Sequence, residues 1–306
     1  MVFSSSKTSR RSLLKIGRLG IIAIPFLYFS KLLGFISHKS IQQLPKIGLQ
    51  LNSVQRELRI NSKDTLKQIS YMGFAGFEVP NMINGMSFDD YGKMLKKSNL
   101  NVIAIHTELP LDQERKDDIL MKSKIFKCNR IIWHGQPEDP AYKSEQGITQ
   151  LAQKYNSANQ FARSNGLVFG IHNHWWEFEK FENGKLPFDL LLEQLDRDIF
   201  FELDVYWIAV SGQDPVEIIR KLGPRAPILQ VKDGPAVWTP EFDDQFPDPV
   251  LAVGTGEMDY PAIFEAGHGN VEWIIVDIEA CKTDIIQAIF DSYRYIAGNR
   301  FGVGLK

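Results

Sequence analysis

Four of the six histidines in the chain stand directly after short apolar runs. They are His106, His134, His172 and His174. Other such runs end in, or are followed by, carboxylates, an amide and a lysine: Glu78, Asp204, Gln230, Lys232, Asp277 and Glu279. Imidazole and carboxylate groups bind divalent metal ions and move protons near neutral pH. Gathered in one pocket, these residues could carry out metal-assisted proton transfer.

Each of these residues taken alone has a structural explanation. A histidine at the end of a strand is commonly a hydrogen-bonded structural residue, and Asp204 or Asp277 could cap a following loop or helix. The group as a whole favours a pocket, because the beginnings of the same runs carry mostly Lys, Asn, Arg and Pro. Aromatic rings, which suit the C–H faces of a sugar, lie on the same side of the runs. They are Trp133, Trp175, Trp176, Tyr206 and Trp207.

The apolar runs predict β-strands at residues 46–51, 76–79, 101–105, 130–133, 168–171, 199–203, 227–231 and 273–277. Helical patterns lie near 62–72, 88–98, 111–126, 143–165, 187–195, 214–222, 259–267 and 283–297. This alternation is typical of a parallel sheet built from βαβ units, and it predicts one (β/α)8 barrel over residues 45–306. A doubly wound open sheet is the alternative, but the first strand is followed by no glycine-rich phosphate loop. In a barrel, side chains at the carboxyl ends of the strands surround the mouth, where active sites lie.

Residues 1–44 have the composition of an export signal rather than of a fold. Paired arginines in SRRSLLK (9–15) precede the apolar run LGIIAIPFLYF (19–29), which is shorter than the roughly 20 residues that span a bilayer. The pattern resembles a bacterial twin-arginine signal. We therefore expect export to the periplasm or attachment to the outer face of the inner membrane, with any membrane contact made through this leader only.

The charge balance and the cysteines exclude other classes of protein. Residues 39–306 carry 29 Lys and Arg against 37 Asp and Glu, a balance of −8, so a nucleic acid is not expected as the main partner. Cys128 and Cys281 lie far apart without metal-binding spacing and predict no disulfide framework. A small-molecule sugar is the expected partner, and a homo-oligomer remains open.

Several segments resemble, in order, the xylose isomerase-like TIM-barrel family, also called sugar phosphate isomerases/epimerases, in an exported subgroup that carries an HNH segment. They are LQLNSVQ (49–55), GFEV (76–79), GIHNHWWEFE (170–179), ELDVYWIAVSGQDPVEIIRKLG (202–223), APILQVKDG (226–234), VGTGEMDYPAIFEAG (253–267) and VEWIIVDIEAC (271–281). The resemblance runs from about residue 47 to 297. It implies a divalent metal at the barrel mouth that polarises a substrate oxygen while neighbouring groups move protons.

The resemblance also implies which residues do this. The family's metal ligands are Glu, Asp, His and Glu from strands five to eight, and here the positions hold His172, with His174 as the alternative, Asp204, Gln230 and Asp277. With two anionic ligands instead of three, such a site would hold Mg²⁺ or Mn²⁺ weakly. The candidates for proton transfer are His172, His174, Glu177, Lys232 and Asp277. The candidates for substrate contact are Glu78, His106, His134, Trp176, Trp207 and Glu279.

Three functions follow as hypotheses. The first is a sugar or keto-sugar isomerase, epimerase or related lyase. The second is a sugar-binding or regulatory barrel that has lost turnover, because Gln230 and Asp277 depart from the family pattern. The third is a metal-dependent DNA-repair nuclease on the same barrel, which the acidic body disfavours.

Overall fold

The structure is a computed structural model that describes residues 43–79, 86–97, 101–108, 111–134, 140–237, 250–279, 281 and 283–305. Almost all of the predicted leader (1–42) therefore lies outside the described residues. The side chain of His134, a predicted substrate contact, also lies outside them. Among the described residues no helix is long and apolar enough to cross a membrane.

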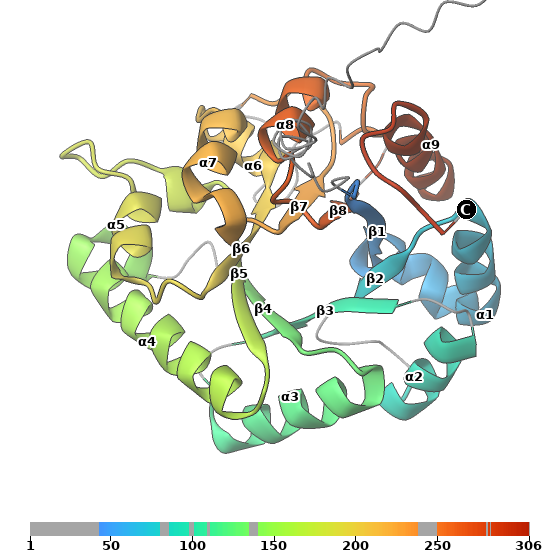
Figure 1. The fold of residues 1–306 in the computed structure, drawn as a ribbon, viewed down its shortest axis with the longest axis horizontal. Coiled ribbons are helices and arrows are strands. Elements are labelled where there is room, and N and C mark those ends of the chain that lie inside the picture. The colour runs from blue at the N-terminus through green and yellow to red at the C-terminus, as the bar shows by residue number, and fades with distance from the viewer. Residues whose placement is uncertain are drawn as a thin grey trace, which may run out of the picture. The chain divides into compact units, whose positions relative to one another are not determined.

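Residues 43–305 form a closed barrel of eight parallel strands in the order β1 to β8, ringed by helices (Figure 1). The strands are β1 (Lys46–Gln50), β2 (Gly76–Val79), β3 (Asn101–Thr107), β4 (Arg130–His134), β5 (Val168–His172), β6 (Phe200–Asp204), β7 (Ile228–Val231) and β8 (Trp273–Val276). Pairing of β1 with β8 closes the ring. The predicted (β/α)8 barrel is confirmed, and the doubly wound alternative is wrong.

The helices follow the predicted alternation. They are α1 (Gln55–Met72), α2 (Phe88–Lys97), α3 (Gln113–Phe126), α4 (Glu145–Ser164), α5 (Pro187–Gln194), α6 (Val205–Val210), α7 (Pro215–Leu222), α8 (Tyr260–Ala266) and α9 (Ile285–Gly298). Short 3-10 turns occupy Leu51–Val54, Pro140–Lys143, Trp176–Phe178 and Gly223–Arg225. Helix α6 was not predicted; it begins directly after β6, where Asp204 accepts hydrogen bonds from the backbone N–H groups of Tyr206 and Trp207 and so caps the helix.

The part of the barrel interior toward the amino-terminal ends of the strands, here called the lower part, is apolar and close-packed. A buried cluster of Ala75, Ile103, Ala104, Ile132, Phe200, Ile228, Trp273 and Ile275 fills it. Two strands make room for these side chains with glycine: a Cβ on Gly48 would lie 2.5 Å from Ile103 Cδ1, and one on Gly170 would lie 2.3 Å from the Phe200 ring. Large side chains on some strands thus face glycines on others, so the barrel is filled at the packing density usual for protein interiors.

The barrel interior changes from apolar to polar along each strand. Side chains alternate between the two faces of a strand, so Phe200, Glu202 and Asp204 of β6 share the inner face. On β7, Ile228 and Gln230 share it, and Lys232 follows directly after the strand. Two polar layers therefore lie above the apolar one: a lower layer level with Glu202 and Gln230, and an upper layer level with Asp204 and Lys232.

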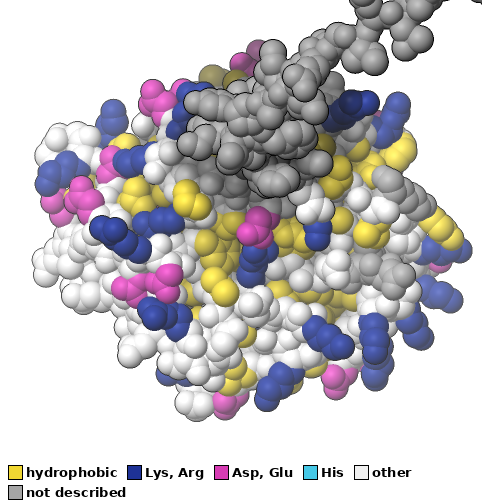
Figure 2. Space-filling view, in the orientation of Figure 1, with side chains coloured by type: hydrophobic (Ala, Val, Ile, Leu, Met, Phe, Trp, Pro, Cys, Tyr) yellow, Lys and Arg dark blue, Asp and Glu magenta, His cyan; other side chains and the backbone are white. Residues whose placement is uncertain are grey.

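Figure 2 shows the molecule from the direction of Figure 1. On the face in view, hydrophobic side chains lie toward the centre around one acidic and one basic group, and most Lys and Arg side chains lie in separate groups nearer the rim. Acidic side chains stand among several of these groups.

Candidate active site at the carboxyl ends of the strands

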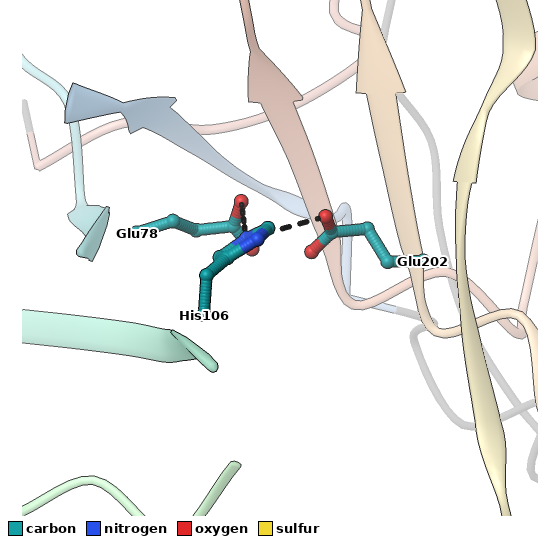
Figure 3. A group of neighbouring side chains, drawn as sticks. All are labelled: Glu78, His106 and Glu202. Atoms are coloured by element: carbon teal, nitrogen blue, oxygen red, sulfur yellow. Dashed lines mark ion pairs between the residues drawn. The ribbon is translucent and has the colours of Figure 1, made fainter. Parts of the chain in front are cut away.

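The lower polar layer brings together two glutamates and a histidine from three strands. Glu78 of β2 and Glu202 of β6 approach the ring of His106, which ends between them (Figure 3). His106 Nε2 lies 3.5 Å from Glu78 Oε2 and 3.6 Å from Glu202 Oε1. Both glutamates are fully buried and His106 is nearly so. Two buried carboxylates with one imidazole form a site with an excess of negative charge.

Two glutamine amides hold the carboxylates of this layer in place. Gln230 Nε2 donates to Glu202 Oε1 at 2.7 Å and to Glu78 Oε2 at 3.2 Å. Gln50 Nε2 donates to Glu78 Oε2 at 3.1 Å and lies at the same distance from His106 Nε2. Glu78 Oε1, Glu202 Oε2 and Gln230 Oε1 are buried without a hydrogen-bond partner. Buried acceptors of this kind are costly, so these three oxygens suit a bound cation or a proton.

The two glutamates differ in their affinity for a proton. Burial acts to raise the pKa of Glu78, but hydrogen bonds with His106, Glu202 and Gln230 outweigh it and hold that pKa below its ordinary value. Burial raises the pKa of Glu202 well above its ordinary value, and the charge of Glu78 raises it further. Neighbouring carboxyl groups whose pKa values are driven apart are typical of sites that transfer protons.

The Glu78–His106–Glu202 cluster could bind a metal ion. One ligand atom from each residue lies within 4.8 Å of the other two, and all three residues are buried. Carboxylate oxygen and imidazole nitrogen are ligands for Zn²⁺ and Mn²⁺, and a divalent ion would neutralise both carboxylates. The unpartnered oxygens of the cluster show that its residues fit such an ion.

The upper polar layer has a lysine at its centre. Lys232 Nζ lies 2.5 Å from Asp204 Oδ2 and 3.7 Å from both Asp277 Oδ2 and Glu279 Oε2. The lysine side chain is 1% exposed and Glu279 is 21% exposed, so Glu279 is the most accessible carboxylate of the layer. Lys232 also lies 5.5 Å from the centre of the Trp207 ring. This layer therefore carries its own cation.

The charges of the upper layer act on one another. Burial lowers the pKa of Lys232, but Asp204, Glu279 and Asp277 outweigh it, and the lysine keeps its proton at any physiological pH. Burial raises the pKa values of Asp204 and Asp277, and Lys232 opposes this rise. Burial together with the charge of Asp277 raises the pKa of Glu279 to about 8. Glu279 therefore carries a proton that it can exchange near neutral pH.

The structure places the predicted metal ligands in two layers instead of one. Asp204 and Asp277 contact Lys232 in the upper layer. Gln230 belongs to the lower layer and directs its amide nitrogen at two glutamates. The fourth predicted ligand, His172, has its Nδ1 3.2 Å from Glu202 Oε1. The His172–Asp204–Gln230–Asp277 set stays a prediction, and its two aspartates do not fit a metal here because an ammonium group already occupies their shared side.

Glu202 is the site residue that sequence reasoning missed. The sequence predicted Glu78 and His106 as substrate contacts and assigned no role to Glu202, whereas all three meet in the barrel. The missed signal was spacing, because Glu202 and Asp204 stand two residues apart in one strand and must share a face. That spacing places Glu202 one layer deeper than Asp204.

Aromatic rings form a wall beside these layers. His174 stacks on Trp176 with ring centres 4.1 Å apart and an angle of 13° between planes. Trp175 and Trp207 pack with centres 4.6 Å apart. Trp176 and Trp207, both predicted substrate contacts, are buried. Much of each ring therefore packs in the core.

Glu177 follows Trp176 of this wall directly in the chain. It is buried, and it accepts hydrogen bonds from the backbone N–H of His174 at 2.9 Å and from Tyr142 Oη at 3.5 Å. Burial raises the pKa of Glu177 to about 8. These contacts make Glu177 a residue that positions the segment after β5.

The closed parallel barrel with titratable groups at its strand ends defines a (β/α)8 protein, a class in which active sites lie at this end of the strands. The sequence profile of the family described as "Xylose isomerase-like TIM barrel" matches residues 66–288, which is more than half of the chain. The chain belongs to this family.

Solved structures share the fold at low sequence identity. A sugar phosphate isomerase/epimerase from Parabacteroides distasonis has a TM-score of 0.70 and 22% identity, over 86% of this chain and 96% of that one. An L-ribulose 3-epimerase has a TM-score of 0.60 and 18% identity, over 84% and 95%. The IOLI protein, which contains a bound zinc atom, has a TM-score of 0.57 and 13% identity, over 82% and 97%. No curated protein matches the sequence.

Proposed function

We propose that this chain is a sugar or keto-sugar isomerase or epimerase, or a related lyase, that moves a proton at a carbon next to a carbonyl group. The observation that carries the proposal is the pair of polar layers: the lower layer holds two neighbouring glutamates, one with a raised and one with a lowered pKa, and the upper layer holds the Lys232 ammonium beside Asp204. The family and the L-ribulose 3-epimerase among its structural neighbours support a small sugar as the substrate.

We assign the divalent metal of the proposed reaction to Glu78, His106 and Glu202. When bound, such an ion polarises a carbonyl oxygen and stabilises negative charge that develops on it. Gln230 and Gln50 orient the two glutamates by the hydrogen bonds described above. The unpartnered Gln230 Oε1 is a further oxygen directed into this layer.

The residues of the upper layer handle the proton. Glu279 is the accessible carboxyl group, and with its pKa at about 8 it donates or accepts a proton near neutral pH. Lys232 balances the charge when Glu279 is ionised, because its ammonium lies 3.7 Å from that carboxylate. His172, beside Glu202 in the lower layer, and Asp277, beside Lys232 in the upper layer, remain candidates for the second proton-transfer group.

Deuterium exchange tests the proposed activity. The protein is incubated in D2O with Mn²⁺, Mg²⁺ or Zn²⁺ and a panel of phosphorylated and unphosphorylated ketoses, and loss of C–H signals next to the carbonyl is followed by NMR. We expect exchange in at least one sugar and its loss in Glu279→Gln and Glu202→Gln. Glu272→Gln is the matched control, because Glu272 precedes β8 at the opposite end of the strand and pairs with Arg130.

A sugar-binding barrel without turnover is the second candidate. Its supporting observation is that Asp204, the one ligand position that matches the family pattern, accepts hydrogen bonds from Lys232 and two backbone N–H groups. Saturable sugar binding by calorimetry without exchange under any metal would favour it over the enzyme. Absence of both binding and exchange would contradict both candidates.

We also propose that the leader directs export by the twin-arginine route. The supporting observation is the SRRSLLK segment before a short apolar run. Replacing Arg10 and Arg11 together by lysine is expected to retain the protein in the cytoplasm, as judged by cell fractionation. Unchanged distribution of the variant would contradict this route.

A further inference from the structure

Lys232 is the buried cation of a side-chain cluster in which the three neighbouring acids come from one side of the barrel. Asp204 ends β6, whereas Asp277 and Glu279 follow β8. Strands β6 and β8 flank β7. Lys232 follows β7 directly and so stands between them. Carboxylate oxygens arranged around one point are the ligands that bind Mg²⁺ and Mn²⁺ in proteins. Here that point is taken by the Nζ atom of the chain's own lysine.

The parts of this cluster are held from several sides. Asp204 Oδ1 accepts the N–H groups of Tyr206 and Trp207, at 3.0 and 3.1 Å, which leaves Oδ2 facing Lys232. The buried amide of Asn173 bonds both the N–H and the C=O of Asp204, at 3.0 and 3.2 Å. Tyr260 Oη donates to the backbone carbonyl of Lys232. The ammonium is therefore a fixed part of the site.

We propose that Lys232 fills, from within the chain, the cation position that the family resemblance assigns to a metal held by Asp204 and Asp277. The upper layer then needs no metal, and the divalent ion of the proposed function belongs to the lower layer alone. The presence of an ion in the lower layer rests on the proposed function, whereas the role of Lys232 in the upper layer does not. Removal of the ammonium leaves the buried Asp204 and Asp277 without a counter-charge, and a divalent cation would supply one.

Metal stoichiometry of the full chain tests the proposal without using activity. The probe is Mn²⁺ alone, counted by calorimetry and by elemental analysis after gel filtration. We expect one ion in the wild type, an unchanged count in Asp204→Asn, and loss of the ion in Glu202→Gln. In Lys232→Met, which keeps an unbranched side chain shorter by the charged atom, we expect a second ion, and we expect it to disappear in the double variant with Asp204→Asn.

Two control variants separate the proposed role from general effects of charge. Lys221 forms an exposed ion pair with Asp189 at 2.7 Å, so Lys221→Met removes the same charge and should leave the count unchanged. Lys232→Arg keeps a cation and should bind no second ion. It also serves as the test if Lys232→Met fails to fold, because an extra ion in Lys232→Arg would contradict the proposal.

The outcomes distinguish this inference from the proposed function. If the wild type binds no ion and Lys232→Met binds one, the lower metal site is wrong and the role of Lys232 stands. If Asp204→Asn loses the wild-type ion and Glu202→Gln keeps it, the metal lies in the upper layer and the inference is wrong. If a folded Lys232→Met binds as many ions as the wild type, the inference is also wrong.

Discussion

Replacing Glu177 by glutamine should change how the stability of the protein depends on pH. Glu177 lies buried under the segment that carries His172 and His174. Its two oxygens accept hydrogen bonds from the backbone N–H of His174 and from Tyr142 Oη, which lies 3.2 Å from Tyr155 Oη. Glutamine keeps an acceptor oxygen for His174 and cannot ionise. The substitution therefore tests the ionisation of Glu177 with little change in packing.

The size of the effect follows from the pKa of the buried carboxyl group. Burial raises it from 4.5 to about 8. The folded state consequently binds a proton more tightly than the unfolded chain, so the stabilising contribution is complete below pH 4.5 and is lost as the pH rises through 8. The difference between the two pKa values corresponds to an upper limit of about 5 kcal/mol in the free energy of unfolding, at 1.36 kcal/mol for each pH unit.

Urea unfolding at pH 5 and at pH 8.5 measures this contribution. The wild type should lose more stability than Glu177→Gln between the two pH values, by several kcal/mol. Comparison with the variant is needed because burial raises the pKa values of Glu202, Asp277 and Glu279 in the same direction. Glu179→Gln, at an exposed position two residues further, is the control and should follow the wild type. Parallel pH profiles for wild type and Glu177→Gln would refute the reasoning.

Three further predictions concern the barrel and its lower layer. Gly170→Ala should lower the free energy of unfolding by about 1–3 kcal/mol, because its Cβ would lie 2.3 Å from the Phe200 ring. Thermal melts should show no loss of stability for the control Gly298→Ala, whose Cβ would meet nothing within 4 Å. Asp233→Ala should speed proteolysis of the loop before α8. The Asp233 carboxylate accepts three backbone N–H groups, two from that loop and one from the residue that follows Asp233. A cleavage rate equal to that of the wild type would contradict this role. Gln230→Lys should abolish Mn²⁺ binding by the lower layer, because an ammonium would replace the amide that lies 2.7 Å from Glu202; calorimetry that still detects one ion would show that the lower layer is not the site.

The fold could be predicted from the sequence because the apolar runs that mark its strands are local and recur along the chain. Each strand of the barrel is covered by helices on its outer face and by other strands' side chains within, so it reads as a continuous apolar run. The run IFFEL predicted β6 within one residue of its observed start at Phe200. Helix α6 was missed because it follows β6 without a connecting loop, and its apolar VYWIAV sequence shows no helical alternation.

The partners within the site could not be predicted in the same way. The sequence indicates that Asp204, Lys232 and Asp277 stand at strand ends, but not that one ammonium lies within ion-pair distance of both acids. That pairing depends on the register between β6, β7 and β8, in which Asp204 stands opposite Gln230 and Gln230 opposite Ile275. Strand register is a property of the closed barrel as a whole. A family pattern of ligands therefore cannot show by itself whether an oxygen is open to a metal or already paired.

The two layers show how neighbouring strands build two different cation environments two residues apart. On β6 and β7 the lower pair is Glu202 with Gln230, a carboxylate bonded to a neutral amide. The upper pair is Asp204 with Lys232, a carboxylate bonded to an ammonium. The amide offers Glu202 no positive charge, whereas the lysine offers Asp204 one, because an amide contributes a dipole and an ammonium a full charge. The difference between Gln230 and Lys232 therefore directs an external cation to the deeper layer and leaves Glu279, at the mouth, free to exchange its proton.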